Sequence, residues 1–182
     1  MTSRTYSLGV LTLVSLCIVS PALAGPLHDA AEKGDLDQVK QLIAQGAKVK
    51  AKDKTGATPV YRAALNGHTA VVEFLIAQGA KVKAKNKYGD TPLHAAAYYG
   101  HTAIAELVIA KGARVNARND GGYTPLHVAA RHGSVAVAEL LIAKGANVNA
   151  RDLRDYTPLD WADRWTRDTP MIELLKRHGA KK

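Results

Sequence analysis

Histidine is the residue type best able to do chemistry in this sequence, because imidazole binds metals and transfers protons near neutral pH. The chain contains seven histidines. Five of them occupy positions that recur along the chain: His28, His68, His94, His101 and His127. His132 does not recur, and one histidine without a partner at ligand spacing is more typical of a contact residue than of a metal ligand. We therefore expect no metal site.

Carboxylates and nucleophiles give no stronger indication of catalysis. The sequence contains no HExxH motif, paired carboxylates or serine elbow. Asp160 and Asp163 lie one helical turn apart, but beside Trp161 and Arg164 we interpret them as surface or capping charges. With neither a catalytic motif nor a cofactor motif, the sequence predicts a protein that is not an enzyme and that needs no cofactor.

The first 24 residues have the pattern of a secretory signal peptide. Arg4 gives a positive start, residues 8–19 are apolar, and Ala22 and Ala24 form the small-x-small pattern that signal peptidases read. We expect cleavage between Ala24 and Gly25. The mature chain would then be one domain with a formal charge of +8, against +9 before cleavage, because Arg4 is the only charged residue removed.

Two alternatives concern this leader. An uncleaved anchor would need about 20 apolar residues, whereas Pro21 ends this run early. A lipid on Cys17 is disfavoured by the bulky Leu16 before it. Because Cys17 is the only cysteine, the cleaved chain would lack disulfides and thiol chemistry. A small exported chain without cysteine favours a bacterial periplasmic protein, with secretion as the alternative.

A repeat of 33 residues organises the rest of the chain. The sequences TPVY, TPLH, TPLH and TPLD begin at Thr58, Thr91, Thr124 and Thr157, and a further copy begins at Pro26. Alanines and glycines recur with the same period. Internal repeats of this length are typical of solenoids. We expect five units, at about residues 26–52, 53–85, 86–118, 119–151 and 152–180.

Each unit has the pattern of two short helices followed by a turn. In the third unit Thr91 can cap the first helix, Pro92 suits its first turn, and Gly100 permits the left-handed residue that ends it. Residues 102–111 have the apolar spacing of a second helix, and a polar turn follows. Such short helices do not persist alone in water, so we expect the units to stack through alanines and aliphatic residues.

Two segments carry a clear family resemblance. GDTPLHAAAYYGHTAIAELVIAKGARVNAR (residues 89–118) and GYTPLHVAARHGSVAVAELLIAKGANVNAR (residues 122–151) resemble ankyrin repeats, and the likeness covers residues 26–180. The resemblance implies an all-α solenoid of about five helix–turn–helix units with projecting β-turn or hairpin fingers. It also implies that partners meet these fingers and the exposed, concave side of the first helices.

The two end units depart from the repeat. Asp37 and Gln38 replace apolar residues of later units, which predicts a more polar, capping first unit. In the last unit Gly179 lies 34 rather than 33 positions after Gly145. We expect the extra residue within residues 164–170, in a loosened turn between the two helices.

The positions that the repeat pattern leaves free are rich in aromatic residues, and tyrosine, tryptophan and arginine dominate protein interfaces. We therefore expect binding of another protein, with no enzymatic role. The predicted partner-binding residues are Lys54, Arg62, Asn66, Lys87, Tyr88, Asp90, Tyr98, Tyr99, Tyr123, Arg131, His132, Arg154, Tyr156, Trp161 and Arg164. The alternative is that some of these rings pack inside the stack. Trp165, in the altered last unit, is the ring for which we most expect a structural role.

A second feature is a ladder of lysines. AKVKAKDK (residues 47–54) and AKVKAKNK (residues 80–87) place a lysine at every other position of two successive turns. Alternate residues of an extended segment point the same way, so the ladder could bind a polyanion or the cell envelope, and a partner protein could carry an acidic surface. We favour the simpler interpretation of a solvated face. Nucleic acid is not expected, because no groove-reading motif is present, and we expect a monomer.

Overall fold

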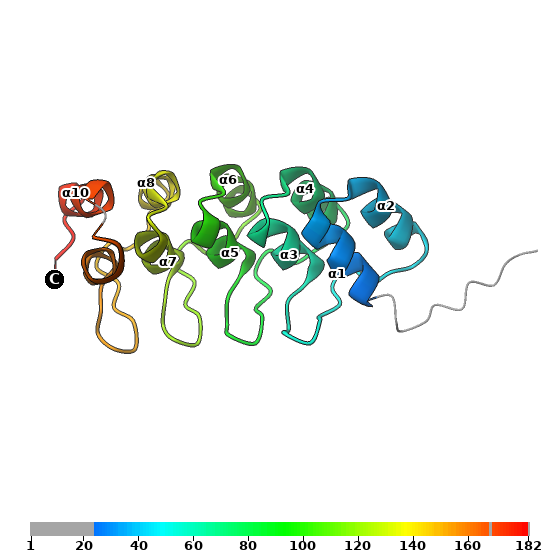
Figure 1. The fold of residues 1–182 in the computed structure, drawn as a ribbon, viewed down its shortest axis with the longest axis horizontal. Coiled ribbons are helices and arrows are strands. Elements are labelled where there is room, and N and C mark those ends of the chain that lie inside the picture. The colour runs from blue at the N-terminus through cyan, green and yellow to red at the C-terminus, as the bar shows by residue number, and fades with distance from the viewer. Residues whose placement is uncertain (1–23, 168, 182) are drawn as a thin grey trace, which may run out of the picture.

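The structure is a row of helix pairs with loops projecting from one edge (Figure 1). It is a computed structural model that describes residues 24–167 and 169–181. The predicted signal peptide, apart from Ala24, lies outside these residues. The inner helices, next to the loops, are α1 (Ala24–Lys33), α3 (Pro59–Leu65), α5 (Pro92–Tyr99), α7 (Pro125–His132) and α9 (Pro158–Trp161). The outer helices are α2 (Leu36–Ala44), α4 (Thr69–Ala77), α6 (Thr102–Ala110), α8 (Val135–Ala143) and α10 (Thr169–Arg177).

The ends of the inner helices follow from local sequence. α5 begins after Thr91, which forms a capping box with the His94 side chain, and Pro92 occupies the first turn. Gly100 ends the helix at φ 74°, a left-handed conformation that glycine adopts without steric penalty. α7 has the same capping box and a glycine at the equivalent position. The predicted helix–turn–helix unit is confirmed.

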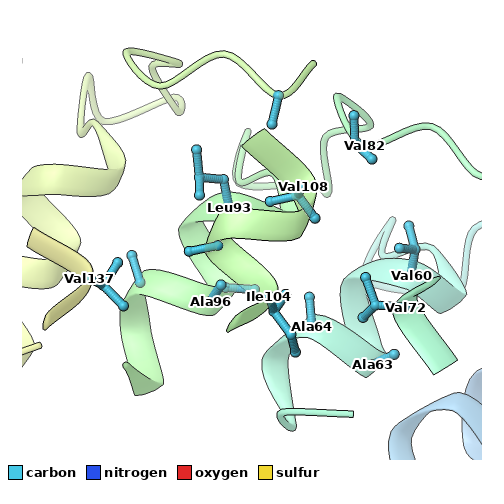
Figure 2. Packing of buried hydrophobic residues seen from close by; sticks show 14 of the residues in the cluster. Val60, Ala63, Ala64, Val72, Val82, Leu93, Ala96, Ile104, Val108 and Val137 are labelled. Carbon is cyan, nitrogen blue, oxygen red and sulfur yellow. The ribbon is translucent and has the colours of Figure 1, made fainter. Parts of the chain in front are cut away.

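Small and aliphatic side chains hold neighbouring units together. Ala63, Ala64 and Ala96 on the inner helices are fully buried, and they let α3 and α5 approach closely. Ile104 and Val108 from α6 fill the space behind them (Figure 2). The core therefore runs through every unit, which confirms the solenoid. Within the described ranges, no helix combines the length and apolar character that crossing a bilayer requires.

The loops between units are fingers closed by side chains. In the third unit, Asn86 Oδ1 accepts hydrogen bonds from the backbone N–H groups of Tyr88 (2.8 Å) and Asp90 (3.0 Å). The equivalent Asp or Asn closes each of the other three fingers in the same way. Adjacent fingertips are joined by backbone hydrogen bonds, such as that from Asp120 N–H to the Tyr88 carbonyl (3.1 Å). The fingers therefore form one continuous edge.

The sequence predicted a more polar first unit from Asp37 and Gln38, and the structure supports this at only one of the two positions. Gln38 is exposed, whereas the equivalent Val71 is buried. Asp37 is also exposed, but so is the equivalent Ala70, so Asp37 replaces no core residue. Only Gln38 therefore marks the outer helix of this unit as an end of the stack.

The last unit places its extra residue inside a helix. α10 begins 34 residues after α8 begins, whereas α9 begins 33 residues after α7 begins. Between them η2 (Ala162–Thr166) continues α9 as a π-helix, a wider turn that absorbs one residue without ending the helix. This π-helix overlaps the expected residues 164–170 at residues 164–166 and begins two residues before that range, and Arg167 ends the turn at φ 49°.

Candidate functional site

A groove lies between the fingers and the inner helices of the second to fifth units, and its volume is about 240 Å³. We call it the aromatic groove. It is lined by Tyr61, Leu65, Tyr88, Asp90, His94, Ala95, Tyr98, Asn119, Tyr123, Val128, Arg131, His132 and Trp161. The predicted site residues among these are Tyr88, Asp90, Tyr98, Tyr123, Arg131, His132 and Trp161. Sequence reasoning assigned several of the others to the scaffold, because they occupy repeat positions that are usually buried.

Two exposed tyrosines end α5 beside the groove. The side chains of Tyr98 and Tyr99 are 43% and 58% exposed, and their ring centroids lie 4.6 Å apart. The Tyr98 ring also lies 3.8 Å from the His132 ring, centroid to centroid. Partial burial, together with the charge of Arg131, lowers the pKa of His132 below its ordinary value. The imidazole is therefore predominantly neutral at pH 7 and stacks on Tyr98 as an aromatic ring.

Trp161 forms the floor of the groove rather than an exposed contact. Its side chain is 3% exposed, and its indole N–H donates a hydrogen bond to Asp152 Oδ2 (2.9 Å). The Tyr123 ring meets it edge-on at 4.5 Å, and the Arg131 guanidinium lies 5.1 Å from its ring centroid. The expectation of an outward-facing Trp161 is therefore wrong, because its indole N–H finds its acceptor inside the unit.

Trp165 takes the exposed position that was expected of Trp161. It projects from η2 with 41% of its side chain exposed and lies 4.8 Å from the Trp161 ring. The Arg164 guanidinium lies 5.5 Å from the ring centroids of both Trp165 and Tyr156. The repeat register agrees with this arrangement, because Trp161 aligns with the buried Ala95, whereas Trp165 aligns with the exposed Tyr99 and His132.

The remaining predicted residues lie outside the groove. Arg62 is held by Asp53 at 2.7 Å and by Glu32 at 3.5 Å. Although burial opposes ionisation of Asp53, hydrogen bonds from Thr55 and Arg62 hold its pKa well below the usual range. Arg62 therefore acts as scaffold in this structure, and Asn66 bonds to its carbonyl. Lys54, Lys87 and Arg154 are exposed on the fingers.

One exposed residue was missed. Leu153 lies on the last finger with 74% of its side chain exposed. The equivalent positions carry Lys54, Lys87 and Asp120, so an apolar residue at a charged position was the available signal.

Comparisons with known families agree with this architecture. Residues 27–119 match a family model described as ankyrin repeats in three copies. The chain belongs to the ankyrin-repeat family. Residues 108–162 match a second model of ankyrin repeats in many copies, and the comparison with curated proteins gives no match. Ankyrin repeats generally mediate protein–protein interaction and are typically not enzymes.

The recurring histidines connect neighbouring ankyrin units. His94 Nδ1 accepts hydrogen bonds from the Thr91 N–H and hydroxyl, and its Nε2–H donates to the Tyr123 carbonyl at 3.0 Å. His127 repeats this pattern one unit later. Burial lowers the pKa of both rings. The part of the chain that the structure describes contains no cluster of three or more potential metal-ligating side chains.

The lysine ladder is partly a structural feature of the ankyrin stack. Lys52 Nζ donates to the Lys85 carbonyl at 2.8 Å, and Lys85 Nζ donates to the Arg118 carbonyl at 2.8 Å. Arg118 in turn donates to the Arg151 carbonyl. One cation per finger therefore bonds to the next unit at the same repeat position. We call these bonds the inter-unit lysine–arginine bonds.

Proposed function

We propose that this chain binds a partner protein through the aromatic groove and the fingers beside it. The observation that carries the proposal is where large apolar side chains are exposed. Among the described residues they are Tyr88, Tyr98, Tyr99, Leu153 and Trp165. All five lie on fingers, at the end of α5 or in η2, and none lies on an outer helix. An apolar set confined to one surface is typical of an interaction site.

The chemistry of the groove supports a partner with an apolar or aromatic segment beside acidic residues. Tyrosine and tryptophan bury large areas with few rotatable bonds, so they act as interface anchors. Lys87 and Arg154 are exposed on the fingers beside these rings, and the formal charge of the chain is +9. Cations around an apolar centre would attract and orient an acidic partner.

Site-specific cross-linking tests the proposed surface directly. A photoreactive amino acid in place of Tyr99 should cross-link to a partner in extracts of the native host, because this side chain is exposed beside the groove. The same group in place of Glu106, which is exposed on the outer helix α6, is the matched control and should give no such product. Equal labelling from both positions would show that the groove is not the binding surface.

A stability measurement separates binding from folding. Tyr98→Ala with Tyr99→Ala should abolish the cross-linked complex and change the free energy of unfolding by about 1 kcal/mol or less, because both rings are largely exposed. Trp161→Ala should instead lower it by about 3 to 5 kcal/mol, because this ring is buried and bonded to Asp152. Both are measured by urea unfolding followed by circular dichroism. A loss of several kcal/mol in the double tyrosine variant would assign these rings to the core.

Export of the chain is a separate proposal, supported by the leader pattern at residues 1–24. A partner would then be met in the periplasm, with the extracellular space as the alternative. N-terminal sequencing of the natural protein should begin at Gly25. An intact Met1 on the protein isolated from its host would contradict removal of the leader.

A further inference from the structure

Two basic pockets lie on successive fingers, away from the aromatic groove. The first has a volume of about 170 Å³ and is lined by Val49, Lys50, Lys52, Thr58, Lys81 and Ala84. The second has a volume of about 410 Å³ and is lined by the residues 33 positions later, together with Asn116 and Arg118. The two pockets are therefore one site built twice. Among the described residues, no acidic side chain lines either pocket, and neither shares a lining residue with the groove.

The cations of each pocket divide into fixed and unpaired ones. Lys52 in the first pocket, and Lys85 and Arg118 in the second, are fixed by their bonds to the next finger. The other cations of the pockets make no hydrogen bond or ion pair with any part of the chain that the structure describes: Lys50, Lys81, Lys83 and Arg114. Each pocket therefore gathers like charges without an internal counter-charge, which favours a bound anion.

The first pocket also contains an unsatisfied polar group. Thr58 is 6% exposed, and its hydroxyl oxygen has no hydrogen-bond partner among the described residues. In the second pocket the equivalent Thr91 hydroxyl bonds to His94 at 2.9 Å. The first pocket lacks this bond because Tyr61 stands where the histidine would be. Buried hydroxyls nearly always have a partner, so an oxyanion or water in this pocket would satisfy the group.

We infer that the two pockets bind one linear chain of phosphate groups that carries no bases. The first two fingers use lysine throughout, at eight positions, and not arginine. The second pocket adds Arg114 and Arg118 from the next finger. Lysine binds phosphate as a compact point charge, and the arginine fork matches phosphate as well as carboxylate. No aromatic residue lines either pocket, so the stacking surface that single-stranded nucleic acid uses is missing.

The repeat sets the distance between the two pockets. Packed helices lie about 8 to 10 Å apart, so equivalent pockets on neighbouring units are separated by a similar distance. A flexible phosphate chain spans this gap with a few of its units and occupies both pockets at once. Binding at the second pocket is then intramolecular, which strengthens the complex without any new contact.

Inorganic polyphosphate and poly(glycerol phosphate) are the probes, and binding to the purified full chain is measured by calorimetry at two salt concentrations. Lys50→Gln with Lys83→Gln removes one unpaired cation from each pocket. Affinity should fall about tenfold. The plot of log affinity against log salt should become shallower, its slope shrinking in magnitude by about 0.7 for each lost contact. Whichever polymer the wild-type chain binds more tightly identifies the form in which the phosphate chain is presented.

The matched control is Lys33→Gln with Lys176→Gln, which removes the same charge from exposed positions outside both pockets. The control and the Tyr98→Ala, Tyr99→Ala variant should both bind polyphosphate as the wild type does. Equal loss in the control and in the Lys50, Lys83 variant would overturn the inference. Tighter binding of poly-glutamate or of single-stranded DNA at equal charge would overturn it as well, in favour of an acidic protein or a nucleic acid. Failure of the groove proposal leaves these outcomes unchanged.

Discussion

At the scale of single residues, one repeat position takes several side chains, each with its own consequence. The third residue after the capping threonine is His94 or His127 in two units, Tyr61 in another and Asp160 in the last. Each histidine ring accepts bonds from its threonine and donates to the next finger. Asp160 accepts from the Thr157 N–H and hydroxyl (2.8 and 2.7 Å), as expected for a capping charge. Only the imidazole, with both a donor and an acceptor, joins the cap to the next unit.

This use of the neutral imidazole predicts a dependence of stability on pH. His94 and His127 have folded-state pKa values below the ordinary 6.5, owing to burial. As pH falls below about 6.5, these histidines therefore take up protons in the unfolded chain before they do so in the folded chain. Their contribution to the free energy of unfolding is fully present above that pH and is lost below it. Each ring should contribute a loss of up to about 1.4 kcal/mol per pH unit until its folded-state pKa is reached.

Urea unfolding at several values between pH 7.5 and pH 5 measures this slope, a range chosen at about one unit or more above the ordinary carboxylate pKa. The double substitution His94→Gln with His127→Gln should flatten the slope, whatever it does to stability at neutral pH. A wild-type stability that is constant across this range would show that the two rings are not buried in their neutral form.

The sequence was sufficient to predict the role of a residue that acts on the backbone next to it. Thr91, Pro92 and Gly100 have local roles, so the start and end of α5 could be predicted. The sequence could not predict which group in the next unit a ring bonds to, because this depends on which backbone carbonyl the neighbouring unit places within reach. For Trp161 and Trp165 the register indicated which ring is buried, because the equivalent Ala95 is buried and the equivalent Tyr99 is exposed, but it could not show that the Trp161 indole N–H bonds to Asp152.

At the scale of elements, the fingers are more than loops that display side chains. The inter-unit lysine–arginine bonds join each finger to the next, and asparagines add further bonds in the later units. Asn116, for example, donates to the Gly145 carbonyl (3.0 Å) and accepts from the Asn147 N–H (2.8 Å). The alternating lysines predicted a cationic face. They could not reveal which lysine reaches a carbonyl of the next unit, because that depends on the spacing between stacked units.

Loss of the inter-unit bonds should lower stability without changing the helices. Lys52→Met with Lys85→Met keeps the length of both side chains and removes two exposed, charge-assisted hydrogen bonds. We expect the free energy of unfolding to fall by about 1 to 2 kcal/mol in total. The control is Lys48→Met with Lys81→Met, which removes the same charge from the same fingers where no such bond exists. Urea unfolding should show no loss in the control, and equal losses would attribute the effect to net charge.

At the scale of the whole molecule, the two ends of the stack differ. The helices form a row in which each unit contacts only its neighbours (Figure 1), so stability is close to a sum over units and the interfaces between them. Asn116 and Asn149 bond across the later interfaces. Lys50 and Lys83 stand at the equivalent positions of the first two fingers and make no such bond within the described chain. The N-terminal interfaces therefore carry more charge and fewer hydrogen bonds.

This asymmetry predicts that the stack opens from its N-terminal side, because local opening begins where interfaces are weakest. Native-state amide hydrogen exchange should be faster in α2 and α4 than in α8. Lys83→Asn should slow exchange in α4 by roughly tenfold, because the new amide can bond the Gly112 carbonyl and the Arg114 N–H as Asn116 bonds its own neighbours. Lys81→Asn, two residues away, is the control and should leave α4 unchanged. The same Lys83→Asn substitution removes an unpaired cation from the second basic pocket, so it should gain stability and lose polyphosphate affinity together. Faster exchange in α8 than in α2 would show that the asparagine bonds do not set the order in which the units open.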